Sequence, residues 1–269
     1  MTNCKISRAD IPFFATTITP SSTVLDFCGV YNLASGQRWS HFAFDSNSTS
    51  RSVVFDLGPS YATKGGTIDH FILCRADLLK AAGVTSVTVA SSPDNAAWTT
   101  RAEELSFASA TLYGPRSEDY IKTVTETSAF RYWRITYVSG SSIDFRHSKL
   151  FLGKFIDFDD SPDFGWKYLE RDAKEFVSSS GVKTFGRTEE QGQVFTITWT
   201  LQSDATIQNF YNKVIRYANS CPVVLYAPTE TQILDGKTLV HADILEVMEA
   251  PKIYSNLSNI TVVFEELQG

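Results

Sequence analysis

The sequence predicts a mostly β fold in two domains, a β-sandwich followed by a second β-sandwich or barrel with one packed α-helix. Aromatic residues make up 13% of the 269-residue chain, with 19 Phe and 11 Tyr, and their flat rings pack well on pleated sheets. Short apolar runs bounded by turn residues recur along the chain, whereas a single segment shows a clear helical apolar period. With 43% hydrophobic and 20% charged residues, the composition is that of a globular protein with a sizeable core.

The first part of the chain is predicted to be a series of short strands. The strand at 52–57 stops at a Gly-Pro pair, and the strand at 86–91 alternates apolar and polar residues before a Ser-Pro-Asp-Asn turn signal. The segment 130–138 is aromatic and β-branched, which favours a strand. Two further strands are predicted at 67–74 and 149–158.

A border between the two domains is predicted at the polar, proline-containing stretch Asp159–Asp163. The predicted domains are therefore residues 1–158, including an N-terminal arm, and residues 159–269. Residues 1–150 carry 14 basic and 13 acidic side chains, whereas residues 151–269 carry 10 and 17. The acidic excess, −6 over the whole chain, therefore belongs to the second domain.

The second domain is predicted to contain one long hairpin, one helix and several strands. Residues 166–171 and 182–187 flank a polar span whose tip is Ser178–Gly181, a pattern typical of a hairpin. Residues 204–219 place apolar side chains along one helical face, and Pro222 ends the helix. The remaining strands are predicted at 193–201, 222–226, 238–247 and 259–265.

The cysteines and the apolar runs indicate where the protein is made. The four cysteines, at positions 4, 28, 74 and 221, form no C-x-x-C pair and are interpreted as scattered, buried thiols. The N-terminus has no apolar run long enough for a signal peptide, and no stretch approaches the roughly 20 apolar residues that span a bilayer. We therefore expect synthesis in a reducing cytoplasm, without membrane insertion. The net negative charge argues against sequence-specific nucleic acid binding.

The sequence offers few residues for catalysis. It contains neither a G-x-S-x-G nucleophile elbow nor an H-E-x-x-H metal motif, and its four histidines are interpreted as structural. Adjacent carboxylates such as Glu103-Glu104 lie in polar stretches typical of solvated loops. Asp45, Ser46 and Asn47 offer oxygen ligands for calcium, but an Asx turn explains the same residues. No enzymatic activity, cofactor or metal is predicted.

The stretch from Trp39 to Gly153 resembles the discoidin-like, or galactose-binding-like, β-sandwich family. A D-L-G strand end at 56–58, an S-x-D-x-x-x-W turn from Ser92 to Trp98 and an aromatic-R-Y-x-R-I strand at 130–135 occur in the order of that family. The resemblance implies a jelly-roll sandwich that holds ligands in the loops at one end, with the turn tryptophan packed on the sandwich.

Candidate ligand-binding residues follow from this resemblance. Recognition of a sugar needs an aromatic platform with hydrogen-bonding neighbours. Tyr61, Tyr113 and Arg116 lie in predicted loops and provide these groups, so they are the candidate glycan-binding residues.

The stretch from Trp166 to the C-terminus resembles the sheet-and-helix domain of tailed-phage tail-tube and distal-tail proteins, on its order of elements. The resemblance implies a ring, hexameric or trimeric, in which the long hairpin contacts the neighbouring subunit. The predicted interface residues on that hairpin are Lys174, Phe176, Val182 and Phe185. An acidic domain suits a channel that passes DNA without binding it, while ordinary solubilising surface charge explains the same excess.

The function that these resemblances imply is structural. We expect a virion protein of a phage tail tip, a distal-tail or baseplate ring component that links the tube to peripheral tail proteins and contacts host-surface glycan. The alternative is a stand-alone carbohydrate-binding module protein that recognises cell-surface glycan. A polysaccharide hydrolase is a third hypothesis, for which the sequence shows no supporting residue triplet.

Overall fold

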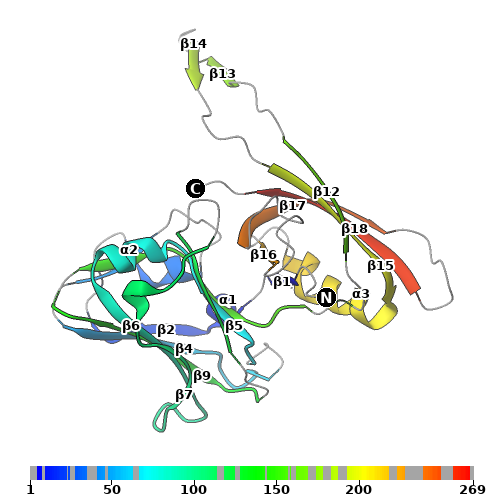
Figure 1. Ribbon diagram of the computed structural model, residues 1–269. Helices are drawn as coiled ribbons and strands as arrows, with labels where there is room; N and C mark the ends of the chain where they lie inside the picture. The colour runs from blue at the N-terminus through cyan, green and yellow to red at the C-terminus, as the bar shows by residue number, and fades with distance from the viewer. Residues whose placement is uncertain are drawn as a thin grey trace. The chain divides into compact units, whose positions relative to one another are not determined.

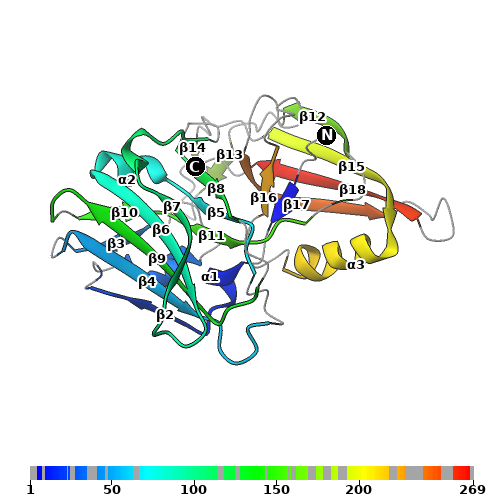
Figure 2. The same ribbon diagram turned by 60° about the horizontal axis from the view of Figure 1, so that its bottom comes forward.

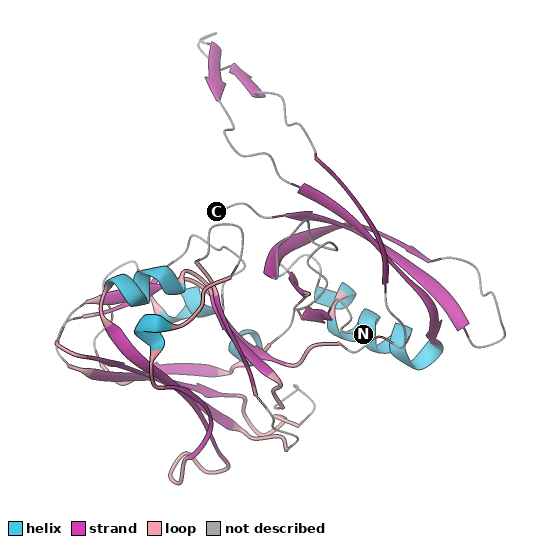
Figure 3. Cartoon of the chain, in the orientation of Figure 1, coloured by secondary structure: helices cyan, strands magenta, loops and turns pink. Residues whose placement is uncertain are grey.

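The architecture is that of a computed structural model of the chain, in which strands dominate (Figure 3). The predicted mostly β fold class is confirmed. The structure describes residues 5–7, 10–22, 24, 28–34, 41–45, 48–62, 67–113, 118–124, 128–142, 144–156, 158, 162–168, 174–177, 183–186, 193–217, 223–227, 239–249 and 257–266.

The chain divides into two compact units. The sandwich unit consists of Ser7–Ile156 and Lys213–Cys221, and the sheet unit consists of the remaining three segments, Met1–Ile6, Asp157–Asn212 and Pro222–Gly269. This division differs from the predicted domains in two short segments. Met1–Ile6 belongs to the sheet unit, and Lys213–Cys221 belongs to the sandwich unit. The N-terminal residues group with the sheet unit because β1 (Lys5–Ser7) lies beside β16 (Val223–Tyr226) in the large sheet.

The first layer of the sandwich unit is a five-stranded antiparallel sheet (Figure 1). Its order is β2 (Thr17–Pro20), β4 (Ser50–Asp56), β9 (Tyr132–Ser139), β6 (Val84–Ser92) and β7 (Thr99–Glu104). Side chains alternate between buried and partly exposed along β4 and β9, which is the period-2 pattern of a half-buried strand. Buried Phe55 lies opposite buried Trp133, and Val53 lies opposite Ile135, so one face of this sheet forms the core.

The second layer combines two smaller sheets. A three-stranded sheet has the order β11 (Leu150–Gly153), β5 (His70–Leu73) and β8 (Tyr120–Thr123), and a two-stranded ribbon pairs β3 (Phe42–Phe44) with β10 (Phe145–His147). Their apolar side chains join those of the five-stranded sheet in one core cluster. The short helical elements of this unit are α1 (Ile11–Phe14), η1 (Val30–Leu33), α2 (Ala76–Ala81) and η2 (Phe107–Ser109).

The sandwich has two ends, which strand register distinguishes. At the exit end, β4 finishes at Asp56 opposite the start of β9, and β11 finishes at Gly153 before the chain continues into the sheet unit. At the far end, β9 finishes at Ser139 opposite Val84, and α2 connects β5 to β6 (Figure 2). Loops at the far end are therefore built around α2, the start of β8 and β10.

The sheet unit contains one six-stranded sheet with the order β1-β16-β17-β18-β15-β12 (Figure 1). The bounds not yet given are β17 (Leu239–Glu249), β18 (Leu257–Glu266), β15 (Gln193–Ser203) and β12 (Pro162–Tyr168). Helix α3 (Asp204–Lys213) packs on this sheet, since the ring of Phe210 lies 6.4 Å from that of Trp199, which also stacks on Phe158 at 4.2 Å. A short turn of 3-10 helix, η3 (Ile215–Tyr217), follows α3.

The predicted long hairpin is present in the sheet unit. Strand β13 (Lys174–Val177) pairs antiparallel with β14 (Lys183–Gly186), and the flanking strands β12 and β15 pair with each other. Of the predicted interface residues, Lys174 and Phe176 lie on β13 and Phe185 lies on β14. Val182 lies outside the described residues. Their role in oligomer contacts stays a prediction.

Candidate functional site

The structure separates the residues that the sequence predicted to bind glycan. Tyr61 follows β4 at the exit end, where its half-buried side chain packs against the sandwich core. Tyr113 precedes β8 at the far end, where its amide donates to the carbonyl of Asp119 at 2.6 Å. Arg116 lies outside the described residues. The two tyrosines therefore do not lie together, and their role in glycan binding stays a prediction.

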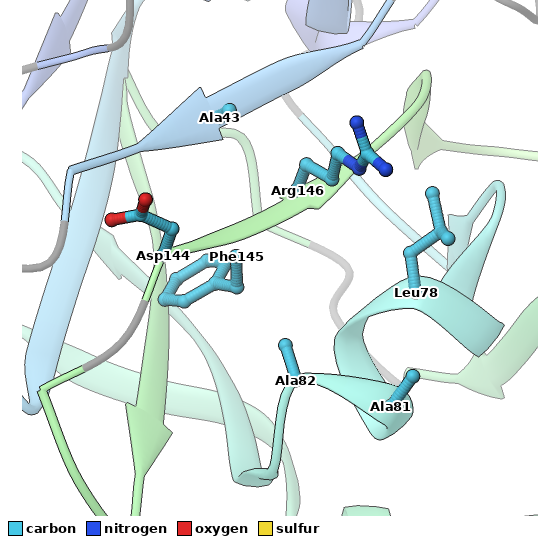
Figure 4. A pocket seen from close by; sticks show the side chains of 7 residues that line it. All are labelled: Ala43, Leu78, Ala81, Ala82, Asp144, Phe145 and Arg146. Atoms are coloured by element: carbon cyan, nitrogen blue, oxygen red, sulfur yellow. The ribbon is translucent and has the colours of Figure 1, made fainter.

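The far end contains a cavity of about 400 Å³ between α2 and strand β10 (Figure 4). Helix α2 and its last turn supply one wall, through Leu78, Ala81 and Ala82. The opposite wall is the β3–β10 ribbon, in which Arg146 lies opposite Ala43. The remaining lining residues are Asp144 and Phe145.

The lining has an apolar centre with a charged group on each side. Phe145 is 3% exposed and forms the floor, and the alanines and Leu78 of the walls complete the apolar lining. Asp144 and Arg146, one residue before and one after it, are exposed because side chains alternate along a strand. Figure 4 shows the Asp144 carboxylate and the Arg146 guanidinium extending in opposite directions from the floor.

Phe145 is held from beneath by a buried arginine. Arg51 is 1% exposed, and its guanidinium carbon lies 4.9 Å from the centroid of the Phe145 ring and 5.9 Å from that of Phe44. Burial lowers the pKa of Arg51, and the negative charges of Asp144 and Asp45 oppose that effect. The same arginine therefore supports the floor of the cavity and attracts one of its rim carboxylates.

A second arginine is fixed at the start of α2. Arg75 has φ 58° and ψ 40°, a left-handed conformation that is strained for a residue with a Cβ. Its Nε lies 3.1 Å from Oδ1 of Asp77 and 3.2 Å from Oε2 of Glu118, and its amide donates to Oδ1 of Asp119 at 3.1 Å. These contacts tie the α2 connection to the segment before β8, where Tyr113 also lies.

His41 lies among the charged groups of the far end. Burial lowers its pKa, and the positive charges of Arg146 and then Arg75 lower it further, against the negative charge of Asp77. The carbonyl oxygen of His41 accepts a hydrogen bond of 2.6 Å from Nδ2 of Asn32. The neutral imidazole is therefore the favoured form at neutral pH.

The segment tied to His41 exposes an aromatic ring that the sequence analysis missed. Tyr31 belongs to η1, whose Leu33 is fully buried, and its own side chain is 70% exposed. The next residue, Asn32, makes the hydrogen bond to His41. No periodic signal marks this tyrosine, because η1 is a single turn placed by one buried leucine and one side-chain hydrogen bond.

Trp98 does not lie in the core. It is half-buried, and the guanidinium carbon of Arg134 lies 4.3 Å from its ring centroid. Arg134 alternates with the buried residues Trp133 and Ile135 along β9, so the stack lies on the outer face of the five-stranded sheet. The family resemblance implied that this tryptophan packs on the sandwich. Trp98 does so on the outer surface of the sandwich.

Two further observations concern the classes of site that the sequence raised. Asp45 is described and half-buried, while Ser46 and Asn47 of the possible calcium cluster lie outside the described residues. In the part of the chain that the structure describes, none of the helices has the length and apolar character needed to cross a membrane.

Comparisons with known proteins find similarity of structure only. No family model and no curated protein matches the chain. Among solved structures, chitosan-binding module 1 of a chitosanase/glucanase from Paenibacillus sp. IK-5 matches with TM-score 0.40 and 17% identity, over 53% of this chain and 97% of the module.

Two other solved structures show a likeness of the same extent. The CBM32 of AlyQ, in complex with 4,5-unsaturated mannuronic acid, has TM-score 0.37 and 17% identity, over 51% of this chain and 94% of that one. CpGH89CBM32-5 from Clostridium perfringens, in complex with GalNAc-β-1,3-galactose, has TM-score 0.40 and 14% identity, over 53% and 98%.

Proposed function

We propose that the sandwich unit binds a glycan in the far-end cavity, and that the chain acts by binding rather than by catalysis. The observation that carries this proposal is the cavity lining, in which the apolar floor at Phe145 lies between the carboxylate of Asp144 and the guanidinium of Arg146. A sugar ring presents apolar C–H patches on its faces and hydroxyl groups at its edge. An apolar floor with hydrogen-bonding groups on both sides is complementary to that pattern.

The volume of the cavity and the fixed side chains around it support the proposal. Its volume of about 400 Å³ lies within the usual range of small-molecule sites. The frame around the cavity is fixed before a ligand arrives, since Arg75 at the start of α2 contacts Asp77 and Glu118, and the floor residue Phe145 is stacked on Arg51. Such preorganisation reduces the entropy lost on binding.

The solved structures named above are a chitosan-binding module and two modules in complex with 4,5-unsaturated mannuronic acid and with GalNAc-β-1,3-galactose. At TM-scores of 0.37 to 0.40 this similarity carries no argument about what the present chain binds. The proposal therefore rests on the cavity and its side chains.

The tail-tip role stays a prediction for the sheet unit. The β13–β14 hairpin and the single packed helix α3 are elements that this role requires, and they are compatible with a glycan-binding sandwich in the same chain. Measurement of the oligomeric state of the purified chain by light scattering tests this role, because a ring component is expected to form hexamers or trimers and a strictly monomeric chain contradicts it.

The binding proposal is tested with the full chain on a glycan array, followed by calorimetry on the glycans that bind. Asp144→Ala and Arg146→Ala are each expected to weaken binding about tenfold or more, since each removes a hydrogen-bonding group from the rim. Arg216→Ala removes an exposed arginine of η3 and serves as the matched control. Absence of binding to any glycan, or binding that survives both rim substitutions, contradicts the proposal.

A further inference from the structure

The acidic groups around the cavity each face an arginine. Asp77 and Glu118 both contact Nε of Arg75, at 3.1 and 3.2 Å. Asp144 acts electrostatically on the buried guanidinium of Arg51. These three carboxylates therefore interact with positive charges of the same chain, and they have less capacity to attract a cationic ligand.

Arg146 differs from these arginines. Its side chain is exposed, and among the described residues no carboxylate or other acceptor pairs with it. Figure 4 shows its guanidinium extending past the floor toward the side of the cavity where Leu78 of α2 lies. Its charge acts on the neighbouring imidazole of His41 more strongly than any other charge does. At the rim of the cavity thus lies a guanidinium that pairs with no described residue, whereas the three carboxylates named above each interact with an arginine.

From this arrangement we propose that the glycan bound in the cavity is acidic, and that Arg146 pairs with the carboxylate of a uronic acid residue. This inference rests on the proposed function, since it names the ligand class of the same site. A guanidinium presents two parallel N–H donors in a plane, which matches the two oxygens of a carboxylate. The C–H face of the same sugar ring then packs on the apolar lining formed by Phe145, Ala81 and Ala82.

The geometry also explains why a carboxylate is preferred to a hydroxyl at this position. A hydroxyl leaves the charge of Arg146 uncompensated when the sugar covers it, whereas a carboxylate neutralises it. The neighbouring His41 favours its neutral form and adds hydrogen-bonding capacity without a second positive charge. A single anionic group per binding site is therefore sufficient.

The test measures affinities of the full chain for trimers of galacturonate, mannuronate and glucuronate, each beside its carboxyl-reduced, neutral counterpart. At least one acidic trimer is expected to bind about tenfold or more tightly than its reduced form, and this preference should weaken as salt concentration rises. Arg146→Gln should abolish the preference while retaining residual binding, Arg146→Lys should restore it only in part, and Arg216→Gln should leave it unchanged.

The outcomes separate this inference from the proposed function. Equal binding of acidic and reduced trimers overturns the inference and leaves glycan binding intact. A preference that persists in Arg146→Gln overturns the role of Arg146. Tighter binding of a sulfated trimer than of every uronate trimer overturns the choice of carboxylate. If neither these trimers nor any glycan on the array binds, both the inference and the proposed function fail.

Discussion

The hydroxyl of Tyr137 and Nε2 of His147 are joined by a hydrogen bond of 2.7 Å inside the sandwich, where both side chains are fully buried. Tyr137 belongs to the central strand β9, and His147 belongs to β10, the strand that carries the floor and rim of the cavity. The bond therefore links the core of the five-stranded sheet to the wall of the binding site. The burial of His147 makes the stability of the folded chain sensitive to pH.

His147 is expected to destabilise the folded chain in acid. Burial lowers the pKa of His147 to about 3, from an ordinary value of 6.5. The unfolded chain gains a proton below pH 6.5 that the folded chain takes up only near pH 3, so stability falls as pH falls through this window. Between pH 6.5 and 4.5 the loss is about 2.5 kcal/mol. Urea unfolding of the native chain and of His147→Gln across this range measures it, since the amide does not titrate.

Asp10 is expected to have the opposite effect. Burial raises the pKa of Asp10 to about 7 from 3.8, against the charge of Lys149, while Oδ1 accepts a hydrogen bond of 3.1 Å from the amide of Phe13. A raised pKa stabilises the folded state below pH 4, and this stability is lost as pH rises toward 7. Asp10→Asn keeps the helix cap without the charge, so its stability relative to the native chain should increase by about 2.5 kcal/mol between pH 4.5 and 6.5. A relative stability of Asp10→Asn that does not change with pH would contradict this prediction.

Arg51 is expected to matter for stability more than an exposed arginine. Arg51→Met removes the stack on Phe145 and leaves the charges of Asp144 and Asp45 without their buried partner. We expect a loss of about 3 kcal/mol in the free energy of unfolding. Denaturant unfolding measures the loss, and the exposed Arg216→Met should change stability by less than about 0.5 kcal/mol.

Arg75 tests the strain at the start of α2. Arg75→Ala and Arg75→Gly both remove the contacts with Asp77 and Glu118, but only glycine adopts φ 58° without strain. The glycine variant should therefore be more stable than the alanine variant by about 1 kcal/mol. Thermal unfolding of the pair gives this difference, and an alanine variant of equal or greater stability shows that the left-handed conformation is not retained.

Tyr31 is expected to contribute to binding and not to folding. Its ring is 70% exposed beside the segment that positions His41, so Tyr31→Ala should weaken glycan affinity about fivefold and leave stability within about 0.5 kcal/mol. Leu245→Ala, which truncates a 51% exposed side chain of the sheet unit, is the matched control. Calorimetry and thermal unfolding of the two variants separate binding from stability, and unchanged affinity in Tyr31→Ala excludes a role for the ring.

The sequence was sufficient where a local pattern decides the structure. Alternating apolar residues predicted β6, the Gly-Pro stop predicted the end of β4, and aromatic and β-branched residues predicted β9. The polar tip predicted a long hairpin, and apolar spacing predicted α3. β4 and β9 bury alternate side chains and α3 buries Phe210, and burial of one face leaves a period in the sequence.

The candidate site was not predictable in the same way. Strands β3 and β10 have three residues each, and α2 has six, which is too short for a period to appear. Arg75 occupies a left-handed position that sequence patterns assign to glycine. Only the pairing of distant segments brings His41, Arg75 and Arg146 to one end of the sandwich. A choice of loop residues by type alone, such as Tyr61, does not reveal at which end a loop lies.

The far-end cavity is assembled from stretches of chain that are separate in the sequence, the β3–β10 ribbon and the crossing through α2, with the segment before β8 joined to them by Arg75. None of the lining residues belongs to the five-stranded sheet β2-β4-β9-β6-β7. The ligand preference can therefore change, during evolution or in the laboratory, when a single connection such as α2 is replaced. The five-stranded sheet keeps its strand pairing in that exchange. Grafting a different α2 crossing between Cys74 and Val84 is the smallest such exchange.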